Sequence, residues 1–195
     1  MKLGEIADIV GGQNMTRIST DEASGKSPRN VKVLVPKAIA EGNVIEEDLG
    51  AAGIQKEIDA DRYTKEGDII IKLSSPYDSA LIRSGQEGIV IPSFCAAIRV
   101  KEDTYNKDYL TALLNTKIVR DSLAARVAGS IRPMIRILDL KDLDLPSIPA
   151  EDMEDIGKAF FLSSKKRRLL QNMINLEKEI MDNIIIESVE GGNGA

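Results

Sequence analysis

Apolar positions change their spacing near Pro146, and this change divides the chain into two parts. Before that point, the runs VKVLVPKAI, GDIIIKLS and GIVIPSFCAAIRV are rich in β-branched residues, which predicts buried strands. In NKDYLTALLNTKIVRDSLAARV the apolar residues recur every three or four positions, which predicts one helix. The remainder up to Pro149 predicts a loop, a short strand or helix, and a final strand. Residues 1–149 are therefore expected to form a mixed α/β (α+β) globule.

Residues 150–188 predict one long helix, because this stretch contains no proline and a single glycine, Gly157. Its apolar positions follow two adjacent stripes, which is more than the helix needs to cover one side of its own globule. Such a helix is on the order of 50 Å long. The globule has a radius of gyration of about 15 Å, so the helix should project beyond it. A fold-back into two shorter helices is the alternative, although no proline or strong turn signal marks a break.

The projecting part of the helix is expected to pair with a second helix in a coiled coil. A flexible tail is expected over residues 189–195. The residues expected to mediate dimerisation are Phe160, Leu169, Leu170, Met173, Ile174, Leu176, Ile180, Met181 and Ile184.

Composition narrows the chemistry that the globule can perform. The chain of 195 residues has a net charge of −5, no histidine and one cysteine, Cys95. Without histidine, Ser-His-Asp and Cys-His catalysis and histidine-ligated zinc are excluded. Cys95 lies in an apolar run, which favours a buried structural thiol. We expect no metal and no cofactor. No stretch resembles a signal peptide or a membrane span, so a cytoplasmic protein is expected.

The segment IIIKLSSPYDSALI raises one question of function. A buried strand that runs into Ser74-Ser75-Pro76-Tyr77 is similar in shape to the loop with which base-amine methyltransferases grip their target nitrogen. The match is incomplete, because serine stands where the second position should be proline, and no glycine-rich cofactor loop precedes it. The hydroxyl groups, with Lys72 and Arg83 beside them, either contact DNA or close a turn, and the sequence leaves both open.

A second candidate for DNA contact is residues 117–136, which hold five basic residues and one acid in an acidic chain. Within it, Ser130 and Arg132 follow Gly129, and Arg136 lies four positions on. Backbone N–H groups, serine and arginine are common phosphate ligands, and arginine is the commonest reader of guanine. A solvated helix face is the alternative for the basic residues before Gly129. The early polar loop adds Arg29 and Lys32 as a third candidate.

Several segments, in order, carry a resemblance to a known family. They are KLGEIADIVGGQ, VPKAIAEGNVIEEDL, YTKEGDIIIKLSSPYDSALI, IVIPSFCAAIRV, YLTALLNTKIVRDSL, AGSIRPMIRILDLKDLDLPSIP and the long helix. The chain resembles a target-recognition domain and spacer helix of the DNA-specificity subunit of type I restriction-modification systems. The resemblance implies a recognition globule without catalysis of its own, which binds double-stranded DNA together with a methyltransferase subunit.

Such subunits usually hold two recognition domains and two spacer helices, whereas this sequence supplies one of each. The resemblance therefore implies a helix-paired homodimer that binds a bipartite palindromic site and recruits methyltransferase subunits, with a restriction subunit as an optional further partner. The alternatives are a scaffold or antirestriction protein that does not read bases, and one half of a split, heterodimeric specificity subunit. An enzyme is disfavoured, because no acids cluster in a nuclease-like pattern. No membrane partner is expected.

Overall fold

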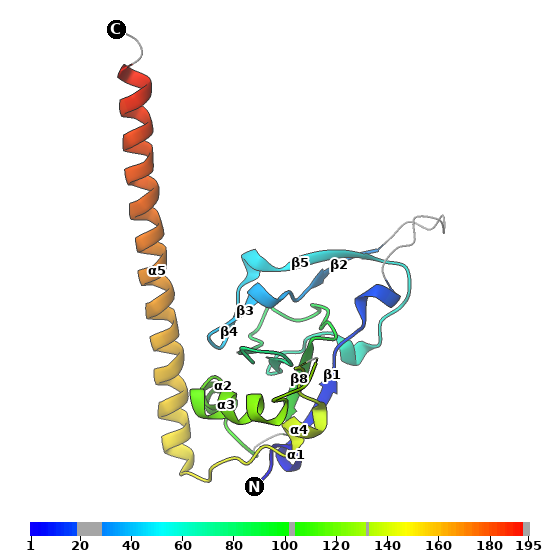
Figure 1. The fold of residues 1–195 in the computed structure, drawn as a ribbon. Helices are drawn as coiled ribbons and strands as arrows, with labels where there is room; N and C mark the ends of the chain where they lie inside the picture. Colours follow the sequence, from blue (N-terminus) through cyan, green and yellow to red (C-terminus); the bar gives the residue numbers. More distant parts are fainter. Residues whose placement is uncertain (19–28, 102–103, 132, 193–195) are drawn as a thin grey trace.

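The computed structural model describes residues 1–18, 29–101, 104–131 and 133–192 (Figure 1). The strands are β1 (Ala7–Gly11), β2 (Arg29–Val33), β3 (Ile39–Ala40), β4 (Asn43–Val44), β5 (Gly50–Ile54), β6 (Ile69–Lys72), β7 (Ser79–Leu81) and β8 (Cys95–Val100). The helices are α1 (Leu3–Ile6), α2 (Lys107–Leu114), α3 (Lys117–Arg126), α4 (Ile137–Lys141) and α5 (Ala150–Gly192). Short 3-10 turns occur at Met15–Arg17, Pro36–Ala38, Glu46–Asp48 and Ala60–Arg62. The expected mixed α/β globule with a long C-terminal helix is confirmed.

A central antiparallel sheet with strand order β1-β8-β6-β7 forms the middle of the globule. Strand β6 is buried on both faces, which explains why its sequence is a continuous apolar run rather than an alternating one. Ile69 and Ile71 pack with helices α2, α3 and α4, whereas Ile70 packs on the opposite face with residues from β3 and β4. The sheet therefore separates a helical layer from a layer of small β-ribbons (Figure 1).

The second layer consists of the β3–β4 hairpin and the antiparallel β2–β5 ribbon. The ribbon has a small apolar cluster of its own, in which Val31, Val33 and Ile54 surround Val90. A parallel bridge between Val33 and Val90 joins the ribbon to the rest of the globule. The expected strand VKVLVPKAI is thus divided between β2 and β3, because the 3-10 turn at Pro36–Ala38 interrupts it.

The single helix expected over NKDYLTALLNTKIVRDSLAARV is wrong, because the structure divides it into α2 and α3. Asn115 ends α2, and the Thr116 side chain accepts a hydrogen bond from the backbone N–H of Val119, which caps the start of α3. The expected final strand near Leu143–Leu145 is also absent from the described strands, where only a bridge between Lys2 and Asp144 remains. Apolar periodicity missed the break because both helices face the same core.

Helix α5 is continuous over 43 residues, so the long helix is confirmed and the fold-back into two shorter helices is excluded. It ends at Gly192, later than the expected position 188. At 1.5 Å per residue its length is about 65 Å. Its first turns pack against α2, and its C-terminal part extends away from the globule with none of the other described helices or strands beside it (Figure 1).

Candidate functional site

The loop between β6 and β7 exposes less than its sequence indicates. The backbone N–H of Tyr77 donates to the carbonyl oxygen of Ser74 at 2.9 Å, and Tyr77 adopts a positive φ of 58°. This tight turn directs the Tyr77 ring into the main apolar core, where the residue is 3% exposed. Ser75 and Pro76 are exposed and Ser74 is half-buried. The loop therefore presents its two serines, but not its tyrosine, to solvent.

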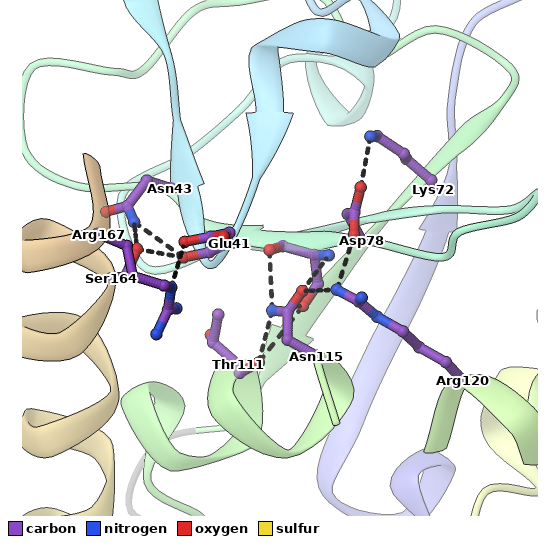
Figure 2. A network of polar contacts seen from close by, with 10 residues as sticks. Glu41, Asn43, Lys72, Asp78, Thr111, Asn115, Arg120, Ser164 and Arg167 are labelled. Atoms are coloured by element: carbon purple, nitrogen blue, oxygen red, sulfur yellow. Dashed lines mark hydrogen bonds and ion pairs between the residues drawn. The ribbon is translucent and has the colours of Figure 1, made fainter. Parts of the chain in front are cut away.

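Lys72 is 8% exposed and belongs to a polar network rather than to a free basic surface. Its Nζ lies 2.8 Å from Oδ2 of Asp78, and a guanidinium nitrogen of Arg120 lies 2.7 Å from Oδ1 of the same carboxylate. Arg120 also donates to the side-chain oxygen of Asn115 at 2.8 Å (Figure 2). Two of the basic side chains considered for DNA contact, Lys72 and Arg120, thus neutralise one half-buried acid beside the loop.

Arg83 lies away from this loop, at the base of helix α5. Its guanidinium is 2.7 Å from the carboxylate of Asp108 and stacks 4.4 Å from the centroid of the Phe161 ring. An ion pair combined with a cation–π contact helps to hold a helix in place. In this structure Arg83 therefore connects the globule to α5.

The segment after α3 lies beside the Ser74–Pro76 loop. The backbone N–H of Ile135 donates to the carbonyl oxygen of Leu73 at 2.8 Å, and Ser74 forms a bridge with Met134. We define the two-loop face as the half-buried Ser74 together with five exposed residues of these segments, which are Ser75, Ser130, Ile131, Met134 and Arg136. The structure thus brings together two of the three candidate segments. Arg132 lies outside the described residues.

Arg136 is an exposed member of the two-loop face that already has one partner. A guanidinium nitrogen lies 3.0 Å from Oδ1 of Asp139, which is 8% exposed. Hydrogen bonds from the Arg136 side chain and backbone lower the pKa of Asp139. The carboxylate therefore fixes one edge of the guanidinium near the surface.

Sequence reasoning missed two apolar members of this face. Ile131 is fully exposed and Met134 is 42% exposed. Apolar side chains at such positions are used by DNA-binding proteins to contact thymine methyl groups or to wedge base steps. The signal was available, since SIRPM places isolated apolar residues between glycine and arginine in a loop.

Arg29 and Lys32 are exposed on strand β2. Their ribbon lies on the opposite side of the central sheet from α3 and α4 (Figure 1). These two residues therefore do not join the two-loop face.

The residues expected to mediate dimerisation behave as one group with a single exception. Phe160 is half-buried and packs edge-on against Phe161, with a centroid distance of 5.2 Å. The others have exposed fractions between 45% and 65%; they are Leu169, Leu170, Met173, Ile174, Leu176, Ile180, Met181 and Ile184. We call these eight residues the apolar face of α5. A long run of exposed apolar side chains at helical spacing is typical of an interface.

The described part of the chain gives little support for a reactive thiol, a metal site or a membrane span. Burial raises the pKa of the Cys95 thiol to about 12, which makes it a poor nucleophile. Among the described ranges no group of three or more metal-ligating side chains converges. Within the same ranges, no helix is long and apolar enough to cross a bilayer.

No protein-family model and no curated protein matches the chain. Solved structures do match it. The HsdS subunit from Thermoanaerobacter tengcongensis is 18% identical with a TM-score of 0.63, over 92% of this chain and 45% of that one. A chain from work on complex assembly and conformational transition of the type I R-M system is 18% identical with a TM-score of 0.56, over 87% and 39%.

The S subunit of a type I restriction-modification system from M. genitalium is 16% identical with a TM-score of 0.55, over 94% of this chain and 43% of that one. The chain thus spans less than half the length of each of these three structures. The match includes most of the described globule and helix together. The chain therefore has the fold of a type I restriction-modification specificity subunit, over less than half of such a subunit's length.

Proposed function

We propose that this chain is the DNA-sequence-recognition subunit of a type I restriction-modification complex. In this proposal it acts as a homodimer paired through α5, binds a bipartite palindromic site and recruits methyltransferase subunits without performing catalysis. The observation that carries the proposal is the combination of a specificity-subunit fold with the exposed apolar face of α5. A restriction subunit is an optional further partner of this complex.

The two-loop face is the candidate surface for DNA. Serine hydroxyl groups and the Arg136 guanidinium are donors suited to phosphate oxygens and base edges. Ile131 and Met134 add apolar contact next to these donors. Because the chain carries a net charge of −5, binding has to come from such a local surface and not from overall charge.

The charge pattern of α5 favours an antiparallel pair. Residues 165–168 are four consecutive basic residues, whereas residues 177–187 contain four acids and one lysine. An antiparallel pair that crosses near Ile174 places each basic segment beside the acidic segment of the other copy. A parallel pair would instead align like charges, which is unfavourable. An antiparallel pair has a two-fold axis across the helices, so the two globules lie at opposite ends and present inverted half-sites.

Selection of binding sites from random double-stranded DNA tests the proposal. The full-length chain is incubated with the DNA pool in the presence of the methyltransferase subunit, and the bound sequences are read. The expected result is two short, inverted half-sites separated by a gap of fixed length and no base preference. Recovery of a single asymmetric site bound by a monomer would contradict the dimeric reader.

A scaffold that does not read bases is the second candidate. The observation in its favour is that Lys72, Arg120 and Arg136 all form ion pairs within the chain. In that case the chain would bind methyltransferase subunits, and the selection would return no sequence preference. A split specificity subunit predicts instead that the chain pairs preferentially with a different half, which mixing two differently tagged chains would reveal.

Replacing Arg136 by alanine is expected to weaken specific DNA binding by about tenfold, since one good base or phosphate contact contributes about 1–3 kcal/mol. Removal of a phosphate contact would also lower the slope of log affinity against log salt by about one. Affinities measured at several salt concentrations check both effects.

Lys37→Ala is the matched control for this change. Lys37 is also an exposed base in an ion pair, at 2.7 Å from Asp48, but it lies on the 3-10 turn Pro36–Ala38, outside the two-loop face. It is expected to change affinity by less than about twofold, as exposed pairs contribute little. Equal losses in both variants would mean that the two-loop face does not contact DNA.

A further inference from the structure

The tip of the β3–β4 hairpin contacts α5 through a nearly buried serine. Ser164 is 3% exposed; its Oγ donates to the backbone oxygen of Glu41 at 2.8 Å and accepts from Nδ2 of Asn43 at 2.9 Å. Arg167 Nε adds a 2.9 Å ion pair to the Glu41 carboxylate (Figure 2). We call Glu41, Gly42 and Asn43 the hairpin tip. It is the last place along α5 where the globule forms a described hydrogen bond with the helix.

Gly42 allows the tip to approach the helix this closely. A Cβ atom at this position would lie 2.5 Å from Cε1 of Phe160, and the φ of +84° also disfavours a side chain. On its other side, Gly42 exchanges backbone hydrogen bonds of 3.0 Å with Ser79 and Leu81 of β7. The tip is therefore held between the central sheet and the long helix.

A second close contact lies seven residues earlier on α5. A Cβ at Gly157 would lie 2.7 Å from Cβ of Asp108 and 2.9 Å from the backbone nitrogen of Tyr109. The two contacts are about 10 Å apart along the helix axis. Two fixed points define a line, so the contact at α2 and the contact at the hairpin tip together determine the direction in which α5 leaves the globule.

The angle at which α5 leaves the globule also determines where the two-loop face lies relative to the helix. Strand β7, to which the hairpin tip is bonded, follows directly after the Ser74–Tyr77 turn and Asp78. A change at the tip would therefore tilt the DNA-contacting loops relative to the spacer. A displacement of these loops by about 3.4 Å equals the rise of one base pair.

We infer that the hairpin tip is a specificity-determining element that acts without touching DNA. By fixing the tilt of the globule on α5, it sets the length of the gap between the two half-sites. This inference rests on the proposed function, because only a paired reader has a gap to set. The bases within each half-site depend on the loops and are independent of the tip.

Two variants test this role in the selection from random DNA with the full-length chain and the methyltransferase subunit. Gly42→Ala pushes Phe160 away from the tip, and it is expected to shift the preferred gap by about one or two base pairs. Ser164→Ala removes the oxygen that joins Asn43 to Glu41, and it is expected to broaden the range of accepted gaps. Both should keep the wild-type half-site bases. If Gly42→Ala does not fold, Ser164→Ala alone decides the question.

Ser188→Ala is the matched control, since it makes the same chemical change at an exposed position of α5, where the hydroxyl donates to the backbone oxygen of Ile185 in the same helix. It should retain the wild-type gap. If Gly42→Ala and Ser164→Ala also retain the wild-type gap with the same sharpness, the inference is overturned while the proposed function stands. If the wild-type chain itself selects no bipartite site, the proposed function fails, and this inference fails with it.

Discussion

Replacing Met173 by aspartate is expected to convert the protein from a dimer into a monomer. Met173 is 65% exposed in the single chain and lies at the middle of the apolar face of α5. In an antiparallel pair it would be buried close to the two-fold axis. Burial of an unpaired carboxylate costs several kcal/mol per ion, and each dimer would contain two. The dimer dissociation constant should therefore rise by about a thousandfold or more.

Sedimentation over a range of chain concentrations measures this change. Asn175→Asp is the matched control, because it adds the same charge two residues away, where Asn175 accepts a 3.1 Å hydrogen bond from Gln171 on the polar side of the helix. It should leave the dimer intact. A wild-type chain that is already monomeric at high concentration, or equal effects of both variants, would contradict pairing through this face.

Loss of the dimer should also remove bipartite DNA binding. A single globule contacts only one half-site. Its free energy of DNA binding should therefore be roughly half that of the dimer, apart from the cost of dimer formation. Half-site binding by Met173→Asp with unchanged base preference is the expected result. This outcome separates assembly, which depends on α5, from base reading, which depends on the loops.

The sequence was sufficient to predict α5 and the central strands because their signals are local. An apolar residue every three or four positions over many turns is typical of a helix and of no strand, and Ile69–Ile71 followed by a polar turn predicts a buried strand. The exposure of the apolar face also followed from length alone, since a helix of this length cannot be covered by so small a globule. These predictions require no knowledge of which segments meet in space.

The candidate site was predicted less well, since its side chains are controlled by remote partners. Lys72 is neutralised by Asp78, which Arg120 shares, and Arg83 is held by Asp108 and Phe161. Nothing in the neighbouring sequence indicates those contacts. The juxtaposition of the Ser74–Pro76 loop with Met134 is likewise a tertiary event. Sequence identified the segments, while the fold determined which of their side chains reach solvent.

The break between α2 and α3 shows the same limit in secondary structure. Asn115 carries a side chain that donates to the backbone oxygens of Ser79 and Thr111 and to Oγ of Ser79, within 3.0 Å in each case. The gain from these hydrogen bonds with β7 favours ending α2 at this residue. Because apolar periodicity continues across the break, only the two polar residues Asn115 and Thr116 signalled it.

Replacing Asp78 by alanine is expected to destabilise the globule by roughly 3–5 kcal/mol, which is typical when one partner of a buried ion pair is removed. The carboxylate of Asp78 is 16% exposed and the side chain of Lys72 is 10% exposed. Without it, Lys72 would be left nearly buried with no described hydrogen-bond partner. Arg120 would also lose its ion pair, and its Nε already has no hydrogen-bond partner among the described residues. Urea unfolding at one fixed chain concentration measures the change.

Asp121→Ala provides the control, since it removes the same group from the exposed ion pair with Lys117, whose side chains are 62% and 87% exposed. That pair should contribute less than about 0.5 kcal/mol. Asp78→Asn should fall between the two, because it keeps an acceptor oxygen but not the charge. Since Asp78 directly follows the Ser74–Tyr77 turn, its loss should also weaken DNA binding in the fraction of chains that stay folded. Equal, small changes in stability for Asp78→Ala and Asp121→Ala would mean that Lys72 finds water or another partner, and that its charge remains available to DNA after all.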